Sequence, residues 1–351
     1  MRAVITSITF FSILFLVSAL LSESSAQQQL TTPQQSLEAS VSQTVGLTNI
    51  TISYHRPGVK GREIWGKLVP FDAVWRAGAN ENTTISFTDE VMIDGKSLPA
   101  GTYGLHMIPS EKEWTIIFSK NYWSWGSFFY DEKEDALRIK TTPVSAEHQE
   151  WLSYSFENPS VNSVDVILHW EKLEVPFKVE INNKVIAEHF KRELDGLGGF
   201  AWQPWNQAAN YALQNNMNID EAISWADHSI NINKVFQNLW TKAGLIEKKG
   251  NLAEAENLRN EAMKISTEAD INNLGYQYLG AKQIDKAIEA FKKNVKDYPD
   301  SWNVYDSLGE GYAAKGETTL AVENYKKAYD MVKDNTQKDR ITNILKGLQA
   351  N

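Results

Sequence analysis

The chain has 351 residues, a formal net charge of −9 at pH 7 and no cysteine. The lack of cysteine excludes disulfides, zinc–thiolate sites, cysteine nucleophiles and a lipid anchor on cysteine. An acidic chain without a basic block is poorly suited to nucleic acid, so we expect no nucleic-acid partner. A chain of this length buries a large core without covalent cross-links.

Residues 1–26 predict a secretory signal peptide. Arg2 provides the positive start, residues 3–21 are nearly all apolar, and Ser-Ser-Ala ending at residue 26 supplies small residues for cleavage. An uncleaved membrane anchor is the alternative, because the apolar run is close to the minimum that spans a bilayer. We therefore expect an exported protein, periplasmic or extracellular, with no integral membrane span after cleavage.

Residues 27–36 are polar and predict a disordered spacer, and residues 37–192 predict an all-β domain. About ten short segments rich in Val, Ile, Thr and aromatic residues alternate with turn residues. Many short strands without intervening helices favour an antiparallel sandwich. In WTIIFS, residues 114–119, apolar residues occupy both faces, so this strand is expected to lie inside its sheet.

Residues 193–201 include the glycine-rich DGLGGF and predict a linker, and residues 202–351 then follow a helical period. Leu308, Gly309 and Tyr312 fit the tetratricopeptide (TPR) pattern L-G-x2-Y, and Gly275 lies 34 residues before Gly309, which is the TPR period. Two earlier copies match more loosely. The last segment, KDRITNILKGLQ, is predicted to be a capping helix that closes the array.

Three stretches of the β-rich half carry a resemblance to a known family. They are YHRPGVKGREIWGKLVPFDAVWRAGANENTTISF, VMIDGKSLPAGTYGLHMIPSEKEWTIIFSK and WGSFFYDEKEDALRIKTTP. Together they resemble the secreted bacterial domain-of-unknown-function family 2911 over about residues 37–190. His55 stands where the family usually has serine, and Phe71 where it usually has tyrosine. The resemblance implies a β-sandwich, in a family often fused to TPR repeats, and it implies no reaction.

The polar stretch VWRAGANEN, residues 74–82, is the centre of a candidate ligand site. An arginine fork suits a carboxylate, a phosphate or sugar hydroxyls, and a tryptophan offers a stacking face. The alternative is a structural turn in which Arg76 pairs with a carboxylate, for which Glu81 is the nearest candidate in sequence. The candidate residues are Arg62, Trp65, Arg76, Asn80, Glu81 and His106.

Four further features of the sequence bear on possible sites. His106 is alone in an apolar strand, which is typical of a buried core histidine. The six histidines show no metal-ligand spacing, so no metal or other cofactor is expected. The acidic run YDEKEDA, residues 130–136, is typical of a solvated loop, and YWSWGSFFY, residues 122–130, would offer a platform for a sugar or an apolar partner wherever it is exposed.

Two functions of different classes fit these observations. The first is an exported cell-envelope binding protein, with a small-ligand site in the sandwich and a TPR surface that docks a protein or peptide. The second is a hydrolase acting on envelope or imported carbohydrate, which would need two facing carboxylates or a histidine–carboxylate pair beside a nucleophile. We favour the first, because no catalytic motif is found in the sequence.

Overall fold

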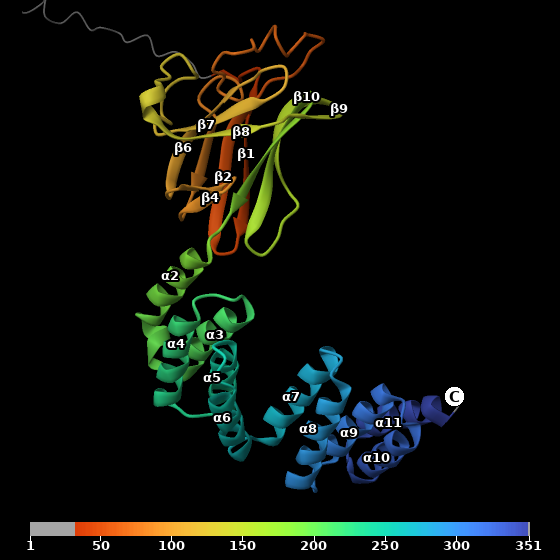
Figure 1. Ribbon diagram of the computed structural model, residues 1–351. Helices are drawn as coiled ribbons and strands as arrows, with labels where there is room; N and C mark the ends of the chain where they lie inside the picture. Colours follow the sequence, from red (N-terminus) through yellow and green to blue (C-terminus); the bar gives the residue numbers. More distant parts are fainter. Residues whose placement is uncertain (1–31, 350–351) are drawn as a thin grey trace, which may run out of the picture. The chain divides into compact units, whose positions relative to one another are not determined.

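A computed structural model describes residues 32–349, which divide into two compact units after Ile181. The predicted signal peptide and residues 27–31 of the predicted spacer lie outside the described residues. The first unit is built mainly of strands and the second of helices (Figure 1).

The first unit contains two antiparallel sheets. One has six strands, in the order β1 (Leu37–Val45), β2 (Thr48–Arg56), β3 (Thr84–Phe87), β6 (Gly101–Ile108), β7 (Trp114–Ser119) and β8 (Asp135–Thr141). The other has four, in the order β5 (Lys96–Leu98), β4 (Val91–Ile93), β10 (Ser163–Glu180) and β9 (Val144–Glu157). The short helix η1 (Glu132–Glu134) precedes β8. The predicted antiparallel sandwich is confirmed.

Aromatic side chains join the two sheets across the sandwich. Tyr54 of β2 packs edge-on against Tyr154 of β9 with ring centres 4.8 Å apart, and Phe118 of β7 packs against Phe177 of β10 at 5.7 Å. The face of β7 that carries Phe118 is therefore the inner one. Ile117, on the outer face, is also fully buried, and β7 lies between β6 and β8, as the sequence predicted.

The second unit is entirely helical. Its helices are α2 (Asn183–Leu194), η2 (Leu197–Phe200), α3 (Trp202–Gln214), α4 (Ile219–Ile232), α5 (Phe236–Lys248), α6 (Leu252–Lys264), α7 (Glu268–Gly280), α8 (Ile284–Asp297), α9 (Trp302–Lys315), α10 (Thr318–Met331) and α11 (Asn335–Gln349). From α3 to α10 they form four helical pairs, one for each predicted repeat. Ile341 of α11 is buried in the core that α8 to α10 form, at the place predicted for the cap.

The boundary between the units differs from the predicted linker at residues 193–201. Residues 183–194 form α2, which begins at the N-cap Asn182 and buries Ile186 and Leu194 in the core of α3 and α4. Isoleucine and phenylalanine at positions 186 and 190 have helical spacing, a signal that the period-two interpretation of this stretch overlooked. The predicted linker itself contains η2 and the end of α2.

Candidate ligand-binding site and docking groove

Arg76 lies in the loop between β2 and β3, and a carbonyl and two aromatic rings hold its guanidinium. Nη1 donates to the backbone carbonyl of Asn80 at 2.6 Å. The guanidinium carbon lies 5.4 Å from the ring centre of Trp125 and 5.8 Å from that of Phe128. These contacts orient the cation but leave its charge unneutralised.

The expected ion pair between Arg76 and Glu81 is absent from the described residues. Glu81 instead places Oε2 3.3 Å from Nε2 of His55. Burial lowers the pKa of Arg76, and the charge of Glu81 opposes that shift from a longer distance. The reason lies in Asn80, whose φ of 56° turns the chain so that its own carbonyl, rather than the next side chain, meets the guanidinium.

A cavity of about 270 Å³ brings Arg62 and Arg76 together at the loop that follows β2. Arg62 donates from Nε to the carbonyl of Val59 at 3.1 Å and from Nη2 to that of Gly58 at 2.6 Å. Lys60, which the sequence did not single out, lines the same cavity. The other lining residues are Gln35, Ser36, Pro57, Gly58, Leu68, Val69, Trp75, Gly78, Ala79 and Trp170.

Trp65 belongs to an aromatic cluster behind this cavity, not to its lining. Its ring centre lies 5.9 Å from Trp75, 4.9 Å from Trp114 and 5.7 Å from Trp170. Trp170 belongs to β10, far from Arg76 in sequence, so the residues around Arg76 in the sequence could not predict that Trp170 lines the same cavity. Trp75 and Trp170 stack with ring centres 5.9 Å apart and both line the cavity.

Asn80 and Glu81 do not line the cavity of Arg62, and each contacts a different part of the chain. Asn80 Nδ2 donates to Gln34 Oε1 at 2.6 Å, so the end of the predicted spacer is bound to the sandwich. Glu81 and His55 line a second cavity, of about 530 Å³, which also holds Ser53. Ser53 Oγ donates to Ser40 Oγ at 3.4 Å, and no hydrogen bond within residues 32–349 links it to His55. This cavity therefore has a histidine–carboxylate pair without an aligned nucleophile.

His106 is buried on the outer face of β6, beneath the loop that joins β7 to β8. Its Nδ1 lies 3.2 Å from Ser127 Oγ, and its ring packs against Tyr130 at 5.4 Å between centres. Desolvation, and then the charge of Arg76, lower the pKa of His106 to about 4. The imidazole is therefore neutral at pH 7, and it does not line the cavity of Arg62. This is the geometry of a core histidine that finds a hydroxyl partner.

The loop between β7 and β8 exposes most of its aromatic run. Trp123, Phe128 and Phe129 have exposed fractions of 72%, 74% and 69%. The acidic run that follows is only partly a solvated loop, because Asp135 accepts hydrogen bonds from Tyr130 and Arg138. The aromatic loop thus lies against Arg76 on one side of the site and is held at its base by an ion pair.

A groove in the second unit is formed by the first helix of three successive pairs. A cavity of about 220 Å³ lies between α3, α5 and α7. Its lining is rich in side-chain amides and hydroxyls. The lining residues are Asn206, Asn210, Phe236, Gln237, Trp240, Thr241, Asp270, Asn273, Leu274 and Gln277. Because stacked repeats place their first helices on one side, this surface is continuous across repeats.

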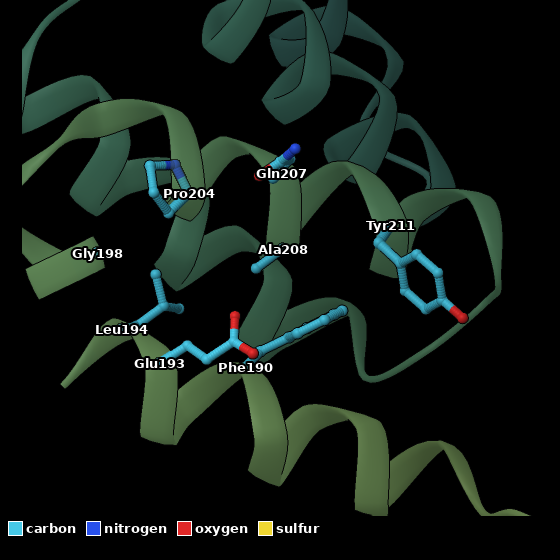
Figure 2. Close-up of a pocket in the computed structure, with 8 residues that line it drawn as sticks. All are labelled: Phe190, Glu193, Leu194, Gly198, Pro204, Gln207, Ala208 and Tyr211. Carbon is cyan, nitrogen blue, oxygen red and sulfur yellow. The ribbon is translucent and has the colours of Figure 1, made fainter. Parts of the chain in front are cut away.

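A more apolar pocket of about 370 Å³ lies between α2, η2 and α3. In Figure 2, Phe190 and Leu194 of α2 face Ala208 of α3, with Pro204 and Tyr211 at the sides. Leu197 of the adjoining η2 is 90% exposed. The pocket exists because the first repeat has no preceding repeat, and α2 covers its apolar face only in part.

Within residues 32–349, no three histidine or carboxylate side chains cluster closely enough to hold a metal ion. In the same part of the chain, no helix is both long and apolar enough to cross a membrane.

Comparisons with known proteins found a matching family and several similar solved structures. The family described as "Protein of unknown function (DUF2911)" matches residues 36–179. One similar solved structure is "MamA 41-end from Desulfovibrio magneticus RS-1", at 16% identity over 42% of this chain and 84% of that one, with a TM-score of 0.28. Another is "Functional Characterization of Pseudomonas Aeruginosa pilF", at 16% identity over 42% of this chain and 67% of that one, with a TM-score of 0.28.

A third is "Crystal structure of YrrB: a TPR protein with an unusual peptide-binding site", at 15% identity over 44% of this chain and 97% of that one with a TM-score of 0.21. No curated protein matches the sequence. The resemblance stated from the sequence is confirmed: residues 36–179 match the DUF2911 family, and the helices after them form pairs in a TPR-like arrangement.

Proposed function

We propose that this protein is an exported cell-envelope binding protein whose helical unit docks an extended peptide segment. The observation that carries the proposal is the groove between α3, α5 and α7, in which five of the ten lining side chains are carboxamides. They are Asn206, Asn210, Gln237, Asn273 and Gln277.

Carboxamides suit an extended peptide because each one both donates and accepts hydrogen bonds, as each peptide unit does. Oδ1 of Asn206 is buried and accepts no hydrogen bond from any of residues 32–349. Trp240, stacked on Phe236 at 5.2 Å, adds an aromatic surface for a side chain of the peptide. A partner helix would hide its own backbone groups and leave these amides without partners, so the extended form is favoured.

The test is selection of a displayed random-peptide library on the purified protein, followed by titration of the selected peptides. Asn273→Arg places a long cation in the groove and should weaken binding at least tenfold. Asn257→Arg makes the same change on α6, outside the groove, and should leave the affinity unchanged. Selected peptides that bind both variants like the wild type, or a library that yields no binder, would refute docking in this groove.

Export is the second part of the proposal, supported by the sequence of residues 1–26. Intact mass of the protein recovered from a bacterial periplasm or medium should correspond to a chain that starts at Gln27. Recovery of the full-length chain in the membrane fraction would instead favour an uncleaved anchor.

The sandwich is proposed to bind a small ligand at the cavity of Arg62 and Arg76. The alternative function, a hydrolase acting on envelope or imported carbohydrate, would use the cavity of His55 and Glu81. It is less well supported, since Ser53 is directed to Ser40 and not to the histidine. Release of reducing sugar from cell-wall polysaccharide, lost in a Glu81→Gln variant, would favour the hydrolase.

A further inference from the structure

The cavity beside Arg62 combines three cations with apolar walls. Lys60, Arg62 and Arg76 line it, and no aspartate or glutamate is among the described residues that do so. This is unusual in a chain whose net charge is −9. The remaining walls include Pro57, Leu68, Val69 and the rings of Trp75 and Trp170.

None of the three cations forms an ion pair with a carboxylate within residues 32–349, although the charges of Glu81 and Glu150 act on Arg76 and Lys60 from a longer distance. Arg62 bonds to two carbonyls of its own loop, and Arg76 to one carbonyl and two aromatic faces. The ammonium of Lys60 lies 5.6 Å above the ring centre of Trp151. The nearby carboxylate of Glu150 accepts from the backbone N–H of Lys60 at 2.8 Å. Guanidinium groups that are oriented in this way keep donors free for an anion.

Trp170 contributes its ring to the same wall. The side chain is only 1% exposed, and its indole N–H has no hydrogen-bond partner among residues 32–349. Buried indole N–H groups usually find a partner, as those of Trp75 and Trp114 do here, with the carbonyls of Gly78 and Ser110. The indole N–H of Trp65, behind the cavity, likewise has no partner among residues 32–349, so the cations and the apolar walls are what point to a ligand.

We infer that this cavity binds a small organic carboxylate, with the carboxylate at the cations and an apolar body against the tryptophan walls. This inference rests on the small-ligand role proposed for the sandwich and names its ligand class. The planar guanidinium fork matches the two oxygens of a carboxylate. A volume of about 270 Å³ suits a compact molecule, and an inorganic anion would leave the apolar walls without contacts.

The test is isothermal titration of the purified protein with benzoate and indole-3-carboxylate. Their neutral amides, benzamide and indole-3-carboxamide, and inorganic phosphate serve as comparison probes. We expect the two carboxylates to bind, and the amides and phosphate to bind at least tenfold more weakly.

Two variants locate the binding. Lys60→Gln removes a cation whose ammonium lies over the ring of Trp151 and forms no ion pair within residues 32–349, so the fold should be retained. Arg62→Lys keeps the charge and loses the fork. Each should weaken benzoate binding at least tenfold. Lys67→Gln removes an exposed cation from the same loop, outside the cavity, and should change nothing.

The outcomes separate the inference from the function on which it rests. Binding of the neutral amides as tightly as the carboxylates would overturn the inference and leave the small-ligand role standing. Tighter binding of phosphate, or carboxylate binding that neither Lys60→Gln nor Arg62→Lys weakens, would overturn it as well. If no probe binds, the inference and the ligand role of the sandwich both fall, while peptide docking by the helical unit is unaffected.

Discussion

At the residue scale, the loop between β7 and β8 governs the behaviour of both Arg76 and His106. It covers His106 with Ser127 and Tyr130, and it lays two aromatic rings on the guanidinium of Arg76. Covering these groups removes water from them, which lowers the pKa of both. The charge of Arg76 repels a protonated His106, so the imidazole stays neutral beside it.

The pH dependence of stability should reveal this arrangement. The pKa of His106 is about 4 when folded, against an ordinary 6.5, so below pH 6.5 the unfolded state takes up a proton that the folded state does not. Stability from this group is therefore complete above pH 6.5 and falls as the pH drops towards 4, by roughly 3 kcal/mol in all.

Urea unfolding from pH 7.5 to 4.5 would measure the loss of stability. His106→Gln should flatten the profile relative to the wild type. His148→Gln, which changes a half-exposed histidine, should not. Parallel profiles for the wild type and His106→Gln would show that His106 titrates normally.

Arg76→Lys tests whether the guanidinium is structural. Lysine cannot lie flat on Trp125 and Phe128 while donating to the carbonyl of Asn80, so we expect a loss of about 1 kcal/mol in unfolding free energy. Thermal unfolding of the two proteins at pH 7 is the measurement. A melting temperature equal to that of the wild type would mean that these contacts add no stability.

At the scale of elements, the repeats depend on glycines that let paired helices approach. A Cβ on Gly275 of α7 would lie 2.2 Å from Cε1 of Phe291 in α8, whereas on Gly309 of α9 the nearest atom, in the ring of Tyr325, is 3.1 Å away. Both glycines occupy the same repeat position, but the tolerance for a methyl group differs between them.

Gly275→Ala should therefore destabilise the helical unit by about 1–3 kcal/mol, because Phe291 is fully buried and cannot move aside. Gly309→Ala should cost less, since a shift of a few tenths of an ångström relieves the contact. Helical circular dichroism during thermal unfolding reports on this unit. The same melting temperature for both variants would contradict the difference in packing.

At the scale of the whole molecule, the chain consists of two units, each with its own core, divided after Ile181. Strand β10 ends at Glu180, and α2 begins at Asn183 with its cap on Asn182. Because α2 packs in the helical core, it cannot be part of a linker. The two units should fold separately.

A fragment of residues 32–181 is expected to fold alone, with the near-ultraviolet circular dichroism of its packed tryptophans and a cooperative melt. A fragment of residues 182–351 should likewise melt cooperatively as a helical protein. Omitting residues 182–194 from the second fragment should destabilise it, since Ile186 and Leu194 would leave its core. An unfolded 32–181 fragment would show that the units share a core.

The sequence by itself determined the fold class of both units, because hydrophobic period is a local property. Alternation fixes which residues of a strand such as Trp114–Ser119 share a face, and the 34-residue spacing of Gly275 and Gly309 fixes the repeat. Arg62 and Arg76 were identified as candidates from their side-chain chemistry, because a guanidinium fork suits a carboxylate, a phosphate or sugar hydroxyls. The strand prediction based on a period of two was wrong at residues 183–191, because the helix α2 directly follows the long strand β10 there.

Only the tertiary structure decided which candidates share a cavity. Trp170 joins Arg62 and Arg76 because β10 packs against the six-stranded sheet, and Lys60 joins them because the chain turns at Lys60 and Gly61, both with positive φ. His106 and Glu81 face other parts of the sandwich, because side chains on opposite faces or separate loops point apart however near they are in sequence. Contacts between segments that are distant in sequence depend on how the sheets pack, and this packing cannot be predicted from a single sequence.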